Sequence, residues 1–250
     1  MGLFRQLLKV IEWKDDSTNI LVYRYPMEDR DEIMNGCQLV VNESQVAILS
    51  KEGQIADVFG PGTHRLETKN IPILTKIAGW KYGFNSPYKA DVYYINTKQF
   101  LDQKWGTSNP VMMRDADFGM IRIRAFGKYA FKVNDAPTLL RQVTGTKQNY
   151  TVDNLKDHFK TMFVSCFSDV IASSKVSALD ISSRYDELGL ELKDALNPAF
   201  NEMGIELTQT YIENVSLPQN VEEAIDKRTS LGILGDKMGS YVAMETEIGR

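Results

Sequence analysis

The spacing of hydrophobic residues separates a short amphipathic start from a strand-rich first half and a helix-rich second half. At the start, apolar residues recur at helical spacing on one face, and charged residues take the other face. This pattern predicts an amphipathic N-terminal helix over residues 1–16. Its apolar and boundary residues are Leu3, Phe4, Leu7, Leu8, Ile11 and Trp13, and its basic residues are Arg5 and Lys9.

Residues 17–134 carry short runs of β-branched and aromatic residues separated by turn residues, which is the pattern of β-strands. The longest run, 118–133, alternates. Apolar residues such as Ile121 and Ile123 share one parity, whereas the other parity carries the basic residues Arg122, Arg124, Lys128 and Lys132. This alternation predicts an apolar face directed inward and a basic face directed outward. Further strands are predicted at 20–25, 38–41, 45–50, 55–59, 80–84 and 91–96.

Residues 135–217 are dominated by helical spacing. Helices are predicted at 136–143 and 152–173, and a third begins near 183, with Pro198 expected to kink or interrupt it and Gly204 expected to end it. A final strand at 205–217 leads into a C-terminal helix over 218–250. Strands, then helices, then one returning strand predict an α+β fold with a mostly antiparallel sheet rather than a doubly wound one.

Composition places the chain among folded globular proteins, because 43% of its residues are hydrophobic and 25% are charged. The net charge of −4 argues against a nucleic-acid-binding protein. No apolar run approaches the roughly 18–20 residues of a membrane-spanning helix, and the N-terminus lacks a secretory pattern. These features predict a cytoplasmic protein.

The residues that most often carry catalysis or bind metals are scarce and scattered. The two cysteines and two histidines show no metal-ligand spacing, and no phosphate-cradling or nucleophile motif occurs. Paired carboxylates such as Asp115 and Asp117 fall in predicted turns, and Cys166 falls on an apolar helical stripe. We therefore expect no catalytic residue, no metal site, no cofactor and no small-molecule substrate.

Four segments, taken together, resemble the SPFH family of stomatin, prohibitin and flotillin, most of all a bacterial branch described as virion-core-protein-like. They are the turn and strand Asn42-Glu43-Ser44-Gln45-Val46-Ala47, the turn Phe59-Gly60-Pro61-Gly62-Thr63-His64, the strand end Gly127-Lys128-Tyr129-Ala130-Phe131-Lys132-Val133, and the Leu217-Pro218 junction with the stretch from Lys227 to Met238. The resemblance implies an SPFH-type domain, with a β-rich subdomain at 17–134 and an α/β subdomain at 135–217.

The resemblance further implies a scaffold that self-associates on a membrane face. Many members carry an N-terminal anchor and a C-terminal coiled coil. This chain instead begins with a short amphipathic segment and ends at Arg250, so either the natural protein is short or the sequence is truncated. The zinc-binding module common in this bacterial branch is missing.

The expected function is a non-enzymatic, membrane-peripheral scaffold on the inner face of the cell membrane. It would form homo-oligomers and organise membrane or membrane-stress partner proteins. The alternative is a soluble cytoplasmic adaptor that binds one protein partner through the N-terminal amphipathic helix. The basic row on the long strand is either a solvated face, a subunit contact, or a contact for acidic lipid, an acidic partner or nucleic acid, the last of which the net acidic charge disfavours. The residues assigned to self-association are Arg122, Arg124, Lys128, Lys132, Leu231, Leu234 and Met238.

Overall fold

The structure is a computed structural model of the 250-residue chain. It describes residues 10–26, 37–51, 53–66, 90–145 and 148–231. These residues form two compact units, and several long strands and helices contribute to both. Unit 1 comprises the described parts of Met1–Gln103, Tyr129–Phe159 and Lys193–Gln209, and unit 2 those of Lys104–Lys128, Lys160–Leu192 and Thr210–Arg250. This division differs from the subdomain boundaries expected at 134 and 217.

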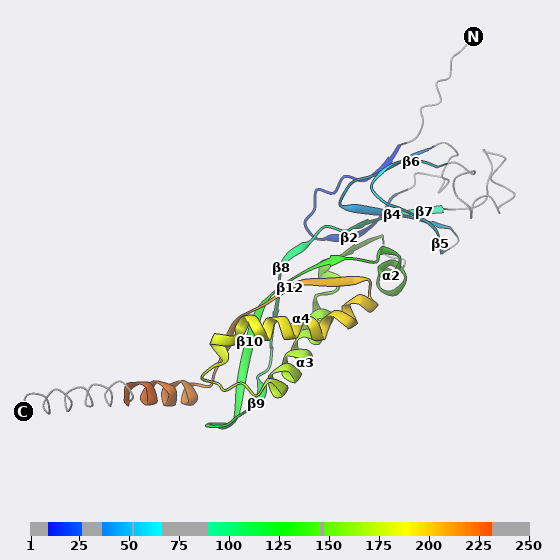
Figure 1. The fold of residues 1–250 in the computed structure, drawn as a ribbon. Coiled ribbons are helices and arrows are strands. Elements are labelled where there is room, and N and C mark those ends of the chain that lie inside the picture. Colours follow the sequence, from blue (N-terminus) through cyan, green and yellow to red (C-terminus); the bar gives the residue numbers. More distant parts are fainter. Residues whose placement is uncertain (1–9, 27–36, 52, 67–89, 146–147, 232–250) are drawn as a thin grey trace, which may run out of the picture. The chain divides into compact units, whose positions relative to one another are not determined.

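Two sheets lie in unit 1. The larger has the order β11-β2-β7-β4-β5, and all its neighbouring strands are antiparallel. The smaller has the order β1-β3-β6, in which β1 is parallel to β3 and β3 is antiparallel to β6. The strands, drawn in Figure 1, are β1 (Val10–Glu12), β2 (Ile20–Arg24), β3 (Gln38–Val41), β4 (Gln45–Lys51), β5 (Gln54–Phe59), β6 (Gly62–Arg65), β7 (Ala90–Asn96) and β11 (Asn149–Thr151).

The predicted N-terminal helix is wrong over residues 10–16, the part of it that the structure describes. Val10–Glu12 forms strand β1 instead, Ile11 is fully buried, and Trp13 packs against the ring of Tyr23 with ring centroids 4.8 Å apart. The Tyr94 hydroxyl lies 2.9 Å from the Ile11 carbonyl oxygen, which fixes β1 to the core. Pairing with β3 and burial of two large side chains outweigh a helical spacing that spans only about three turns.

The second half of the chain supplies the helices. The predicted helix at 136–143 is divided into an α-helix and a π-helical turn, and Pro198 lies inside α4 without interrupting it, because buried residues on both sides of the proline hold the helix on the core. Gly204 follows at a φ of 76°, which only glycine adopts easily. The helices are α2 (Ala136–Leu139) with the π-helical turn Leu140–Thr144, α3 (Lys156–Ser174) preceded by the 3-10 turn Val152–Asn154, and α4 (Tyr185–Glu202) preceded by the 3-10 turn Ile181–Arg184.

A four-stranded sheet has the order β12-β10-β8, with β9 also paired to β10. The buried and exposed residues of β10 alternate as the sequence predicted, with Ile121 and Ile123 inside and Arg122 and Arg124 outside. The sheet also contains strands that the sequence analysis did not predict, namely β8 and β9. The four strands are β8 (Phe100–Gly106), β9 (Val111–Asp115), β10 (Gly119–Val133) and β12 (Ile205–Ser216). The α+β class with mostly antiparallel sheets is confirmed.

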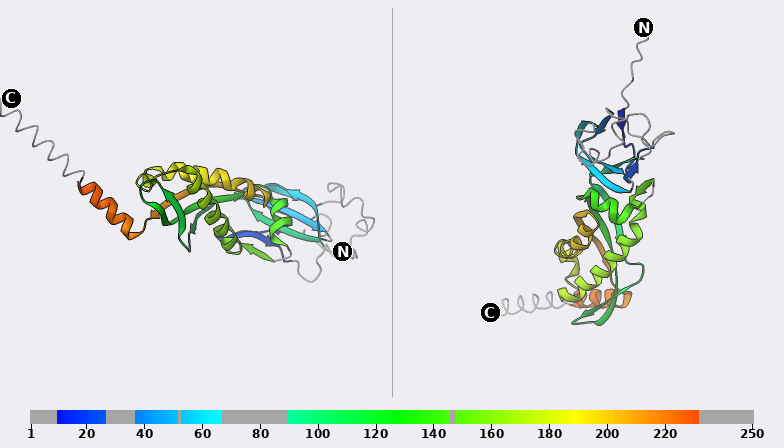
Figure 2. Two further views of the ribbon diagram at one scale, coloured as in Figure 1. Left: turned by 90° about the horizontal axis from the view of Figure 1, so that it is seen from below. Right: turned by 90° about the vertical axis from the view of Figure 1, so that its right-hand side faces the viewer.

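In unit 2, helices cover the buried side of this sheet, as the views in Figure 2 also show for α4 beside β12. The side chain of Trp105, on β8, crosses β10 at Gly127. Its indole N–H group donates to the Tyr211 carbonyl oxygen of β12 at 3.2 Å. Its indole ring stacks on Phe163 of α3, with ring centroids 5.5 Å apart. A Cβ on Gly189 of α4 would lie 2.8 Å from the Thr210 carbonyl oxygen, so this glycine permits close contact with β12. Residues 219–231 are helical.

Candidate functional site

The side of the unit 2 sheet that faces away from the helices carries a mixed arginine and apolar surface. We call it the basic sheet face and define it by Arg114, Arg122, Arg124, Met112, Met120 and Phe126. Strands β9 and β10 are antiparallel, and their register places Met120 opposite Arg114 and Met112 opposite Arg122. Arginines and methionines therefore alternate across the two strands, because directly opposed residues project from the same side of a sheet.

The three arginines are exposed, and within the described parts of the chain none of them has an ion-pair partner. Of the four basic residues in the predicted row, two form ion pairs and two do not. Lys128 pairs with Glu213 at 3.0 Å in unit 2, and Lys132 pairs with Glu206 at 3.1 Å in unit 1, both across to β12. Arg122 and Arg124 thus supply the uncompensated charge of that row, and Arg114 adds to it.

Large apolar side chains lie between these charges. Met112, Met120 and Phe126 are 50%, 55% and 48% exposed, and Tyr211 of β12, which borders the face, is 50% exposed. Methionine, aromatic and arginine side chains are the types enriched at protein interfaces. The sequence analysis missed Met112 and Arg114 because β9 was not predicted, and it did not single out Met120 and Phe126 on the predicted long strand. The alternation of Val111-Met112-Met113-Arg114-Asp115 was the signal that could have found it.

A buried carboxylate holds the end of β9 in place. Asp115 is 4% exposed and accepts hydrogen bonds from the backbone N–H groups of Asp117, Phe118 and Ala178, at 2.8, 2.9 and 2.6 Å. Burial alone would raise the pKa of the Asp115 carboxyl, but these amide hydrogen bonds, that of Ala178 foremost, hold the pKa below its usual value. Asp115 therefore serves a structural role in the turn, as the sequence analysis predicted for this carboxylate.

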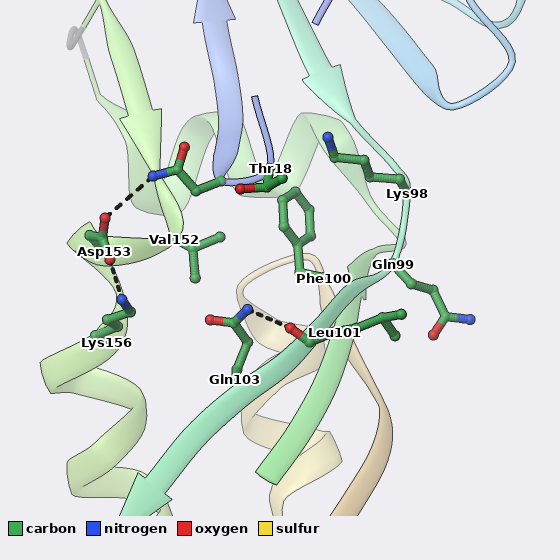
Figure 3. A pocket seen from close by; sticks show the side chains of 10 residues that line it. Thr18, Lys98, Gln99, Phe100, Leu101, Gln103, Val152, Asp153 and Lys156 are labelled. Atoms are coloured by element: carbon green, nitrogen blue, oxygen red, sulfur yellow. Dashed lines mark hydrogen bonds and ion pairs between the residues drawn. The ribbon is translucent and has the colours of Figure 1, made fainter. Parts of the chain in front are cut away.

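A polar pocket of about 490 Å³ lies in unit 1 (Figure 3). Lys98 points toward it but donates to Asp15 at 2.7 Å and to the Ser17 carbonyl oxygen at 2.8 Å. Lys156 is ion-paired with Asp153, which also accepts from Asn19. Since both amines already contact carboxylates, the pocket has little free positive charge with which to bind an anion. No histidine or cysteine is among its lining residues.

The single residues considered for catalysis have structural surroundings. His64 Nε2 lies 2.8 Å from the Gly60 carbonyl oxygen, and the ring packs against Phe59. Burial raises the pKa of the Cys166 thiol, which lowers its reactivity. Cys166 is half-buried rather than fully enclosed in the core. Among the described residues, no group of three or more His, Cys, Asp or Glu side chains has a geometry suited to a metal ion.

Of the N-terminal residues predicted to contact a membrane or a partner, two are buried in the structure and the others lie outside the described residues. Ile11 and Trp13 lie in the core of unit 1 and are therefore wrong as membrane or partner contacts. Leu3, Phe4, Arg5, Leu7, Leu8 and Lys9 lie outside the described residues, as do Leu234 and Met238 at the other end. Leu231 is 70% exposed at the end of the described helical stretch.

Comparison with known proteins matches a model of the SPFH domain-Band 7 family to residues 22–233. The chain belongs to the SPFH domain-Band 7 family. The match includes residues of both units, three of the four segments on which the resemblance rests, and the fourth segment as far as residue 233. The chain is also similar to YdjI of Bacillus subtilis (strain 168), described as an uncharacterized protein, with 28% identity over 239 residues that span 94% of this chain and 73% of YdjI.

Membership of the SPFH family assigns the chain to a group of membrane-associated, scaffold-like proteins that are generally not enzymes and that commonly oligomerise. Within the described residues, no helix combines the length and the hydropathy needed to cross a membrane. The functional residues of an SPFH domain of this kind are therefore to be sought on its surfaces, and the basic sheet face is the strongest candidate in unit 2.

Proposed function

We propose that this SPFH protein is a non-enzymatic, membrane-peripheral scaffold that self-associates and organises membrane or membrane-stress partner proteins on the inner face of the cell membrane. The observation that carries the proposal is the basic sheet face. Three arginines that have no ion-pair partner among the described residues lie between exposed methionine and phenylalanine side chains, and such a surface is suited to another macromolecule. The family match supports the same class of function.

Membrane attachment in this proposal depends on residues 1–9. Leu3, Phe4, Leu7 and Leu8 supply the apolar side chains, and Arg5 and Lys9 supply positive charge for anionic lipid. One such segment binds weakly, but an assembly presents many of them at once, and multivalency converts weak contacts into stable attachment. The adaptor alternative uses the same segment without assembly, so the mass of the protein in solution separates the two functions.

The first test is the mass of the purified full chain by light scattering after size exclusion, compared with a chain lacking residues 1–9. The deletion stops before β1 because Ile11 and Trp13 belong to the core of unit 1. We expect a large assembly in both forms. A monomer in both forms at high concentration would contradict the scaffold and favour the adaptor.

The second test is flotation of the full chain with vesicles that contain anionic lipid. The variant Leu7→Glu removes an apolar residue and should lose flotation, whereas Gln6→Glu introduces the same charge and serves as the matched control. Equal flotation of the two variants would contradict insertion of the N-terminal residues into lipid.

A further inference from the structure

The basic sheet face has a complementary surface elsewhere in unit 2. The first half of α4 exposes Leu190, which is 62% exposed, and surrounds it with carboxylates. We call this the acidic helix face and define it by Asp186, Glu187, Leu190 and Glu191. Glu187 is held by Arg184, but Asp186 and Glu191 have no ion-pair partner among the residues that the structure describes. The two faces have opposite charge, and each contains exposed apolar side chains.

We propose that the basic sheet face of one copy binds the acidic helix face of a second copy, so that the protein assembles head to tail. This inference rests on the self-association proposed above and assigns the surfaces that produce it. In unit 2, α4 packs on the buried side of the sheet, as the approach of Gly189 to Thr210 shows. The helix of the second copy would add a layer on the opposite, bare side, and helices laid on sheets are a stable arrangement.

The charges of both faces lie beside exposed apolar side chains. Arg122 and Arg124 are two residues apart on one strand, which places them about 6.7 Å apart along it. Asp186 and Glu191 are five residues apart on one helix, about 7.5 Å along its axis and about 140° around it, so they flank the exposed side of the helix rather than form a row. Leu190 lies between these carboxylates on the helix surface and would meet the apolar side chains of Met112 and Met120.

A second copy fits this surface better than a lipid bilayer does. Exposed methionine and phenylalanine side chains alternate with the arginines on the basic sheet face. Arginine, methionine and aromatic side chains are the types enriched at protein interfaces.

The pairing has a defined symmetry. The two faces lie on different sides of the same unit, so a pair of copies leaves one basic and one acidic face free. Such heterologous contacts continue from copy to copy and produce rings or filaments rather than a closed dimer. Self-association should therefore grow with concentration, and it should weaken between about 0.05 M and about 0.5 M salt, because ionic screening reduces contacts between exposed charges.

Charge reversal followed by mixing tests the proposal. The sheet variant Arg122→Glu with Arg124→Glu gives two acidic faces, and the helix variant Asp186→Lys with Glu191→Lys gives two basic faces. Each variant alone should lose self-association on the order of 100-fold, because like charges then oppose one another. An equimolar mixture should recover assembly, since each reversed face then meets a complementary face on the other variant. Sedimentation velocity of the full chains measures both effects.

The control variant Lys175→Glu with Lys227→Glu makes the same change in net charge as the sheet variant at exposed positions of unit 2 outside both faces, and it should assemble like wild type. Circular dichroism confirms that every variant is folded.

A mixture that stays dissociated overturns the pairing, as do variants that assemble like wild type. Loss of flotation with anionic vesicles in the sheet variant alone, without recovery on mixing, would instead identify a lipid-binding face. A wild-type chain that stays monomeric overturns both this inference and the scaffold function, whereas the other negative results overturn only the pairing.

Discussion

Replacement of Asp115 provides the sharpest test of how unit 2 holds the basic sheet face. This carboxylate is buried at the end of β9, the strand that carries Met112 and Arg114. Its Oδ1 accepts from the N–H groups of Asp117 and Phe118, and its Oδ2 accepts from the N–H group of Ala178. In Asp115→Ala all three donors lose their acceptor, and the β9–β10 turn loses its connection to the segment before α4.

The expected cost follows from these bonds. The Ala178 N–H group donates to Asp115 in a buried position, so loss of this acceptor costs about 2 kcal/mol. The two turn amides are only partly buried, and water replaces part of each lost bond, which leaves about 0.5 kcal/mol apiece. We therefore expect Asp115→Ala to lower the free energy of unfolding by about 3 kcal/mol. Asp115→Asn retains the oxygen for the turn but directs an amino group at Ala178, and it should cost about 2 kcal/mol.

The measurement is urea unfolding followed by tryptophan fluorescence, with hydrogen exchange of the Ala178 amide as a local readout. Asp117→Ala is the matched control. It removes the same type of side chain two residues further along the chain, where the carboxylate forms only an exposed ion pair with Arg228. Exposed pairs contribute about 0–1 kcal/mol, so this control should change little. Equal losses of unfolding free energy in Asp115→Ala and Asp117→Ala would refute the role of the Asp115 carboxylate in holding the end of β9.

The pH dependence provides an independent check on the same group. Because the folded-state pKa of Asp115 is lowered, its stabilisation is complete above the unfolded-state pKa of about 3.9 and is lost as pH falls through the folded-state value. The difference in unfolding free energy between wild type and Asp115→Ala should therefore be constant from about pH 8 to about pH 5 and shrink below about pH 4. A difference that grows on acidification would contradict this assignment.

Two further substitutions test the packing of each unit. Gly127→Ala would overlap the Tyr211 carbonyl group and approach the indole nitrogen of Trp105 at 2.9 Å, so we expect a loss of about 3 kcal/mol by urea unfolding. Gly60→Ala, where a Cβ meets nothing within 4 Å, is the control, and equal effects would contradict the crossing of Trp105 over β10. Tyr94→Phe removes the hydroxyl that lies 2.9 Å from carbonyl oxygens of β1 and β3, and it should cost about 1 kcal/mol and accelerate hydrogen exchange in β1. Unchanged exchange in β1 would argue against this anchor.

The sequence by itself determined the fold class and most of its elements, because strands and helices impose periods of about 2 and about 3.6 residues on hydrophobic positions. Strand β3 was predicted with its observed ends, and the alternation along β10 identified the buried and exposed faces of the longest strand. The same alternation pointed to Arg122 and Arg124, which are two of the three arginines of the basic sheet face. The family resemblance, confirmed by the match over residues 22–233, also came from local segments.

The tertiary structure decided what depends on contacts between distant segments. Val10–Glu12 forms a strand because β3 offers a partner and the core accepts Ile11, and no local spacing reports either fact. Lys128 and Lys132 were indistinguishable from Arg122 in the sequence, yet carboxylates of β12 neutralise the lysines alone. The acidic helix face and the basic sheet face emerged as complementary only once the strands and helices were folded. Burial and pairing are properties of the folded chain, whereas periodicity is local.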